Sequence, residues 1–440
     1  MAKKKKMPVA GPMAAPVLVA PPKSRGRRYA EIAAWFVIVL WLYFAFRVNF
    51  RSFIGSYLSP SFQAQLIHTL DYSLGFLPRV LSGQLLTFFA GGSTTGPAAG
   101  AYFLTLYAVT YGLFSLILGM LVEKALSTKN YLMALFPLLI IFTTRAVWNR
   151  FFSDRQLDTL MFFFALIAFF LIKNEKPMWL VPVCVCLGIM ASESFMLLFF
   201  PLVFALLYYE FIKSGRKPAR LYHLIATTVS SFALEAYMLW VPFHSELVSR
   251  YSFAEAIAYL ERKIGHAFDD VYVSGGVFGK IPGGQYFPFL SFHTWARAYY
   301  FKPIYYVLAL LICAPILTFT LAIWRRHIKG EKGFWQKSPY ILFMLAPAIL
   351  FPAFLVFMDM DRLVSSVLLT QVLLIAYVFF ADGQNGAFLR LKEIGTGKYR
   401  WLLYASILLG VIVPLLVFHG TPWLNLTVNL ADFGFTDGRA

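Results

Sequence analysis

The sequence predicts an all-α fold, a polytopic transmembrane helix bundle, and three observations lead to this class. Hydrophobic residues make up 59% of the 440 residues, charged residues make up only 14%, and the mean hydropathy is +0.67. A soluble domain carries about 25% charged residues, so this chain has too little polar surface to coat a water-facing globule. The other two observations are a series of long apolar runs and an uneven distribution of positive charge.

The apolar runs have the length of membrane-spanning helices. A hydrocarbon core about 30 Å thick requires roughly 20 apolar residues per helix. Runs of this kind begin near residues 30, 101, 130, 157, 178, 195, 222, 303, 339, 363 and 401. We therefore expect about 11 spans. The runs that begin near 178 and 195 are short and meet at residues 191–194, which indicates either a tight outside turn or a break within re-entrant helices.

The run 74–91 differs from the others. It contains Pro78 and Arg79, it has polar Ser82 and Gln84 in its middle, and a glycine-rich stretch follows it. These features predict a helix that lies in the membrane interface or dips into it, and not a span.

Positive charge predicts the orientation. If the N-terminus is cytoplasmic and 74–91 does not cross, 25 of the 39 Lys and Arg residues fall in the tail and in the cytoplasmic loops. Those loops lie near 123–129, 173–177, 213–221, 325–337 and 382–400. This is the positive-inside bias of membrane proteins, and it would reverse after the tail if 74–91 crossed the membrane.

The chain divides into two parts. Residues 1–28 form a basic, Pro- and Ala-rich tail that we expect to be disordered, to be cytoplasmic and to contact anionic lipid. Residues 29–440 form one helical transmembrane domain with two long outer loops, 51–100 and 244–302. Membrane lipid is the expected partner, and nucleic acid is not. The composition of this tail favours a bacterial inner membrane as the location of the protein.

The second outer loop contains a helix signal. Ser252 and Glu255 have the spacing of a capping box, and Phe253, Ile257, Leu260 and Ile264 then fall on one helical face. This pattern predicts a short amphipathic helix that rests on the membrane surface or on the bundle.

Most carboxylates lie on the predicted outer side, together with several arginines. Charged groups at membrane depth are costly, so they are usually paired or functional. Neither a zinc-ligand spacing, nor a phosphate-binding loop, nor a Gly-x-Ser-x-Gly motif occurs in the sequence, and no metal or cofactor is indicated. The candidate residues are Asp71 as a catalytic group, with Arg79, Arg155, Asp158, Glu235, Asp361 and Arg362 as substrate-binding groups.

These residue types suit sugar transfer from a lipid phosphate. The guanidinium fork of arginine matches phosphate oxygens, which would give Arg79, Arg155 and Arg362 the role of a phosphate clamp. A carboxylate can act as the general base for an acceptor hydroxyl, and Asp71 is the residue in place for this role.

The order of parts resembles the GT-C type of integral-membrane glycosyltransferases, which use polyprenyl-phosphate-linked sugars. That pattern is a cytoplasmic N-terminus, one span, an outer loop with an acidic residue and interfacial helices, and then many spans. The resemblance implies that Asp71 is the catalytic base. The strings Asp71-x-x-x-Gly-Phe-Leu-Pro-Arg79, Arg155-x-x-Asp158 and Asp359-x-Asp-Arg362 are also similar to uncharacterised bacterial polytopic proteins linked to surface polysaccharide.

Other interpretations stay open at this point. Asp71 is also suited to cap a helix near Leu74, and Arg79 is suited to reach lipid headgroups. The outer loop 244–302 also suits a glycan polymerase or ligase. Glu235 and the break near 191–194 would fit a transporter or flippase, and a non-catalytic scaffold would need none of the outer carboxylates.

Overall fold

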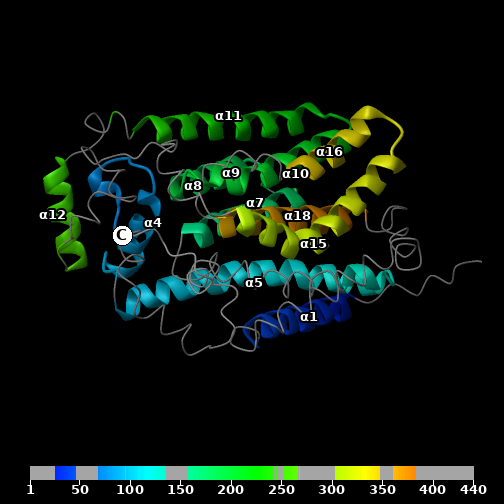
Figure 1. Ribbon diagram of the computed structural model, residues 1–440, viewed down its shortest axis with the longest axis horizontal. Helices are drawn as coiled ribbons and strands as arrows, with labels where there is room; N and C mark the ends of the chain where they lie inside the picture. Colours follow the sequence, from blue (N-terminus) through cyan, green and yellow to red (C-terminus); the bar gives the residue numbers. More distant parts are fainter. Residues whose placement is uncertain are drawn as a thin grey trace, which may run out of the picture.

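The computed structural model shows an all-helical chain in the part that it describes, which comprises residues 25–45, 68–94, 96–134, 157–175, 177–241, 244, 251–265, 267, 303–346 and 360–382. The long helices run roughly along the long axis of the molecule (Figure 1). The elements are α1 Arg25–Ala45, η1 Tyr72–Leu74, α4 Val80–Ala90, α5 Pro97–Ser127, α7 Leu157–Asn174, α8 Leu180–Ala191, α9 Phe195–Leu198, α10 Phe200–Lys213, α11 Pro218–Trp240, α12 Phe253–Ile264, α15 Pro303–Gly330, α16 Phe334–Leu345 and α18 Met360–Asp382.

Two described helices, α5 and α7, are long and apolar enough to cross a membrane. At 1.5 Å per residue α5 is about 46 Å long and α7 about 27 Å long. By the same measure α4 is only about 16 Å long, which is too short to cross a core about 30 Å thick. The prediction that the run 74–91 does not form a span agrees with this length.

The bundle carries basic side chains at one end. There Arg28 at the start of α1 lies 3.5 Å from Glu123 near the end of α5, and Arg220 at the start of α11 lies 2.5 Å from Glu175 after α7. Lys124 donates to the carbonyl oxygen of Phe380 near the end of α18 (2.7 Å). Segments that the charge pattern placed on the cytoplasmic side thus meet at one end, which we call the basic end.

The opposite end carries η1, α4 and α12, and we call it the loop end (Figure 1). The chain from α8 to α10 turns there. α8 ends at Ala191, α9 begins at Phe195, and Glu193 between them contacts the segment that follows η1. The expected feature at 191–194 is therefore a turn at the loop end. Gly188 allows it, because a Cβ at this position would overlap the buried ring of Phe195.

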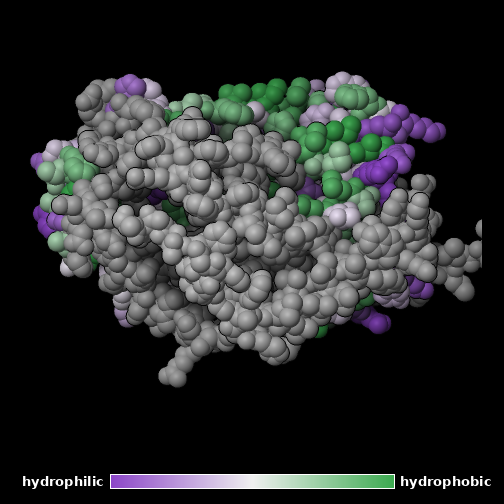
Figure 2. Space-filling model, in the orientation of Figure 1, coloured by the Kyte–Doolittle hydropathy of each residue, from purple (hydrophilic) through white to green (hydrophobic). Residues whose placement is uncertain are grey.

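One side of α11 presents apolar side chains outward. Figure 2 shows hydrophobic residues over α11 and hydrophilic residues at the two ends of the molecule. Large apolar patches on a protein surface mark contact with a partner or with a membrane. The exposed apolar residues of α11 are Leu221, Ile225, Val229, Phe232, Leu239 and Trp240.

The loop end depends on a close approach at Gly83. A Cβ on Gly83 of α4 would overlap the carbonyl oxygen of Leu70, which is backbone and cannot move alone. We expect Gly83→Ala to lower the free energy of unfolding by about 2 kcal/mol, as overpacking does. Gly112→Ala in α5 is the matched control, because a Cβ there meets nothing within 4 Å and alanine favours a helix. Thermal unfolding in detergent tests both variants, and equal melting temperatures would contradict the expectation.

Candidate functional site

Asp71 lies in the segment that leads into η1, and its backbone is extended with φ −134° and ψ 177°. Its Oδ1 accepts a hydrogen bond from the backbone N–H of Ser73 (3.0 Å) and another from the Ser73 hydroxyl. Asp71 is therefore the N-cap of η1, a helix of three residues. The helix of the run 74–91 begins later, at Val80, and its N-cap is Arg79, so Asp71 does not cap that helix as one interpretation of the sequence expected. The side chain is buried, and Oδ1 is the oxygen that caps the helix.

The second carboxylate oxygen of Asp71 accepts hydrogen bonds from side chains of α12. Lys263 Nζ donates to Oδ2 at 2.7 Å, and the Tyr259 hydroxyl donates to the same oxygen at 2.9 Å. Lys263 also donates to the carbonyl oxygen of Thr69 (2.9 Å) and to the Thr87 hydroxyl of α4 (3.3 Å). The Lys263 side chain is only 10% exposed, so the ion pair is largely shielded from water.

Local sequence explains why α12 presents these groups. The capping box is present, with the Ser252 side chain accepting from Glu255 N–H and the Glu255 side chain accepting from Ser252 N–H. It fixes where the helix begins. Tyr259 and Lys263 are four residues apart and therefore share a face of this helix. Ala256 and Leu260 are fully buried in a small apolar cluster with Leu70, Leu74, Leu77, Val80 and Val241. The predicted amphipathic helix thus packs on the segment from Leu70 to Val80.

Electrostatics keep Asp71 charged. Burial by itself raises the pKa of the Asp71 carboxyl, but hydrogen bonds from Lys263, Ser73 and Tyr259 and the charge of Lys263 outweigh burial and hold the pKa below its usual range. The carboxylate is therefore ionised at neutral pH. Burial also raises the pKa of the Tyr259 hydroxyl, and its hydrogen bond to Asp71 raises it further, so Tyr259 acts as a donor here.

A second ion pair lies at the same end of the bundle. Arg79 Nε donates to Glu193 Oε2 at 3.0 Å, and a terminal guanidinium nitrogen donates to Oε1 at 2.5 Å. The Glu193 side chain is 4% exposed and the Arg79 side chain is 24% exposed. Arg79 has a left-handed backbone with φ 68°, which costs a residue with a Cβ about 1–2 kcal/mol. The pair ties the segment between η1 and α4 to the turn between α8 and α9.

The other predicted site residues are placed as follows. Asp158 is fully buried in the first turn of α7, and Glu235 lies in the last two turns of α11. Asp361 and Arg362 belong to the first turn of α18, but their side chains lie outside the described part, as does the whole of Arg155. Asp71 and Arg79 both lie at the loop end, and they have different ion-pair partners, Lys263 and Glu193.

Three residues of this end were not among the predicted site residues, namely Tyr259, Lys263 and Glu193. The capping box could have indicated the first two, because it places them together beside the apolar face of α12.

Aromatic rings also form a row from the Asp71 loop to the end of α11. Tyr72 stacks on Phe76, Phe76 contacts Tyr237 and Tyr237 contacts Trp240, with centroids 5.6, 5.6 and 6.2 Å apart.

Within the described ranges, no group of three or more His, Cys, Asp or Glu side chains could hold a metal ion. No protein family, no curated protein and no solved structure matches this chain. The arrangement of the loop end is therefore the basis on which a function can be argued.

Removing Lys263 tests how α12 is held. We expect Lys263→Met to speed backbone hydrogen exchange in α12 by about tenfold, because the ion pair between Lys263 and Asp71 is lost. The effect stays moderate because the buried Asp71 carboxylate can take up a proton and become neutral. The pKa of Asp71 then rises from its wild-type value, because a lowering cause is gone while burial persists. Wild-type α12 should loosen only as the pH falls through the depressed pKa, since the carboxylate is stabilising above it. Arg262→Gln is the control, because the Arg262 guanidinium donates to the carbonyl oxygen of Ala258 within its own helix and does not contact Asp71. Equal exchange in the two variants would contradict the role of Lys263.

Proposed function

We propose that this chain is a polytopic membrane protein with about 11 spans whose loop end faces the outer side, in a bacterial inner membrane. Three observations support this topology. Basic segments far apart in the sequence meet at one end, α5 and α7 have the length and apolarity of spans, and α11 carries an exposed apolar row. Positive charge marks the cytoplasmic side of membrane proteins, so the basic end is the inner end.

We further infer that the loop end transfers a sugar from a polyprenyl-phosphate-linked donor. The observation that carries this inference is the buried, ionised Asp71 whose countercharge, Lys263, comes from a separate surface helix. An acceptor oxygen attacks the anomeric carbon, its proton passes to Asp71, and the bond from that carbon to the phosphate oxygen breaks. The polyprenyl phosphate leaves with the electron pair, and cations stabilise it.

Lys263 gives this mechanism a way to activate Asp71. In the structure the pair is closed, so the low pKa of Asp71 makes it a weak base. A donor phosphate that draws Lys263 away removes one of the causes that lower the Asp71 pKa, and the effect of burial then raises it toward that of a stronger base. Arg79, Arg155 and Arg362 are the arginines that we propose for the same phosphate.

The positions of the described carboxylates favour an enzyme over a transporter. Transporters place polar groups near the bilayer midplane. Here Asp71 and Glu193 lie in loop-end turns, Asp158 lies in the first turn of α7, and Glu235 lies in the last two turns of α11. Glu123 and Glu210 lie near the basic ends of α5 and α10, where Arg28 and Tyr377 contact them. Carboxylates gathered at the loop-end termini of helices are the arrangement expected of a site at one membrane face.

The test is a mass profile of lipid-linked and surface glycans in cells that lack the protein and in cells that regain it. Loss of one sugar or of the polymer, with recovery on complementation, supports sugar transfer. Complete precursor that accumulates on the inner side alone would instead make the protein a lipid transporter. An unchanged profile would overturn the proposed function.

A further inference from the structure

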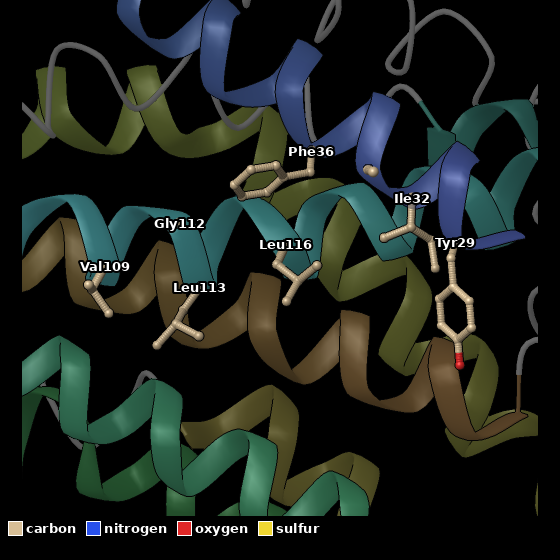
Figure 3. A pocket seen from close by; sticks show the side chains of 8 residues that line it. Tyr29, Ile32, Phe36, Val109, Gly112, Leu113 and Leu116 are labelled. Carbon is tan, nitrogen blue, oxygen red and sulfur yellow. The ribbon is translucent and has the colours of Figure 1, made fainter. Parts of the chain in front are cut away.

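An apolar groove of about 500 Å³ runs between α1 and α5 (Figure 3). Its lining is almost wholly apolar, and the only polar group labelled there is the hydroxyl of Tyr29. The lining residues are Tyr29, Ile32, Ala33, Phe36, Val109, Gly112, Leu113 and Leu116. The groove is distant in the fold from the Asp71 site, because Tyr29 belongs to the first turns of α1, which lie at the basic end.

Two glycines of α5 shape the groove. Gly119 lets α1 pack closely on α5, since a Cβ there would come within 3.0 Å of the backbone nitrogen of Phe36. Gly112, two turns earlier in α5, is part of the groove lining and has nothing within 4 Å of the position that a Cβ would take. The helices are therefore in contact at one level, and an unfilled apolar space lies beside the contact.

A cation lies on α1 one turn before the groove residue Tyr29. Arg25 precedes Tyr29 by four residues, so the two side chains share a helix face. Arg25 is exposed and has no carboxylate partner among the described residues, whereas Arg27 pairs with Glu31 and Arg28 pairs with Glu123. An apolar groove with a phenol in its lining and an unneutralised guanidinium one helical turn away is complementary to a lipid with an anionic headgroup.

We propose that this groove binds one acyl chain of an anionic phospholipid from the leaflet at the basic end, with its phosphate at Arg25 and Tyr29. The inference rests on the membrane topology proposed above and is independent of sugar transfer. Occupation by an acyl chain would remove the exposed apolar lining from water, and the Arg25 charge would select the headgroup.

Native mass spectrometry of the full chain in detergent tests this site. The probe is palmitoyl-oleoyl phosphatidylglycerol, with the corresponding phosphatidylcholine as the uncharged comparison. We expect one retained phosphatidylglycerol in the wild type and a loss of retention of about tenfold or more in Gly112→Leu, because the leucine side chain takes the place of the acyl chain. Gly26→Leu is the matched control, since its Cβ is also unobstructed but lies outside the groove.

The headgroup is tested by a second pair of variants. Arg25→Gln should reduce the preference for phosphatidylglycerol over phosphatidylcholine, and Arg27→Gln should leave it unchanged, because Arg27 is engaged with Glu31. Equal retention by Gly112→Leu and the wild type, or equal effects of the two arginine variants, would overturn the proposal. Stronger retention of undecaprenyl phosphate than of phosphatidylglycerol would overturn the assignment to a phospholipid. A chain that stays in solution without detergent would instead contradict the membrane topology.

Discussion

The variant Asp71→Asn is expected to lower the rate of sugar transfer by about two to four powers of ten, the usual contribution of a general base. Asparagine caps a helix about as well as aspartate, so its Oδ1 keeps the hydrogen bond from Ser73 N–H. The amide nitrogen that replaces Oδ2 carries no charge and cannot accept a proton, nor can it accept the hydrogen bonds of Lys263 and Tyr259. The substitution therefore separates the two roles that the sequence left open for Asp71. The measurement is the initial rate in membranes supplied with a panel of radiolabelled polyprenyl-phosphate monosaccharides.

A control is needed because Asp71→Asn leaves Lys263 buried opposite a neutral side chain. The double variant Asp71→Asn/Lys263→Met removes both charges, and it should restore the packing of α12 without restoring activity. If the double variant regained the wild-type rate, the defect of Asp71→Asn would come from the isolated lysine charge. Asp71 would then be a structural cap and ion-pair partner, and the base would have to be sought elsewhere.

Local features of the loop end could be predicted from the sequence, because local residues determine them. The capping box of Ser252 and Glu255 fixed the start of α12, and two short apolar runs predicted a change of direction at residues 191–194. The charge pattern also grouped the basic segments that meet in the structure. In each case the signal lies within a few residues of the feature, or in a sum over many residues.

The partners of the site residues could not be predicted in this way. Lys263 lies 192 positions after Asp71, and Glu193 lies 114 positions after Arg79. Which of the outer cations meets which carboxylate depends on how α12 packs on Leu70 and Leu74, and apolar packing is not directional. Asp71 and Arg79 are close in sequence, which suggested a common site, but the structure gives each a separate partner.

The variant Glu193→Gln is expected to lower the free energy of unfolding by about 3 kcal/mol, more than Lys263→Met does. The difference follows from what each substitution leaves behind. An isolated Asp71 can take up a proton, whereas the Arg79 guanidinium cannot lose one and must stay charged beside a neutral amide. The left-handed backbone of Arg79 also loses the bidentate contact that compensates for its strain. Thermal unfolding in detergent at neutral pH is the measurement.

The chain provides a matched control in Glu175→Gln. Glu175 pairs with Arg220 at 2.5 Å, the same distance as the shorter Arg79–Glu193 contact, and it also has a positive φ of 57°. The Glu175 side chain is 62% exposed, against 4% for Glu193, while the cations left behind are similarly shielded, with Arg220 16% and Arg79 24% exposed. The two variants therefore compare an exposed with a buried carboxylate, and the cost of Glu175→Gln should stay below about 1 kcal/mol. A large loss for Glu193→Gln with a small loss for Glu175→Gln identifies burial as the cause. Equal losses would show that the burial of the carboxylate does not set the cost, and the large effect expected of Glu193→Gln would be wrong.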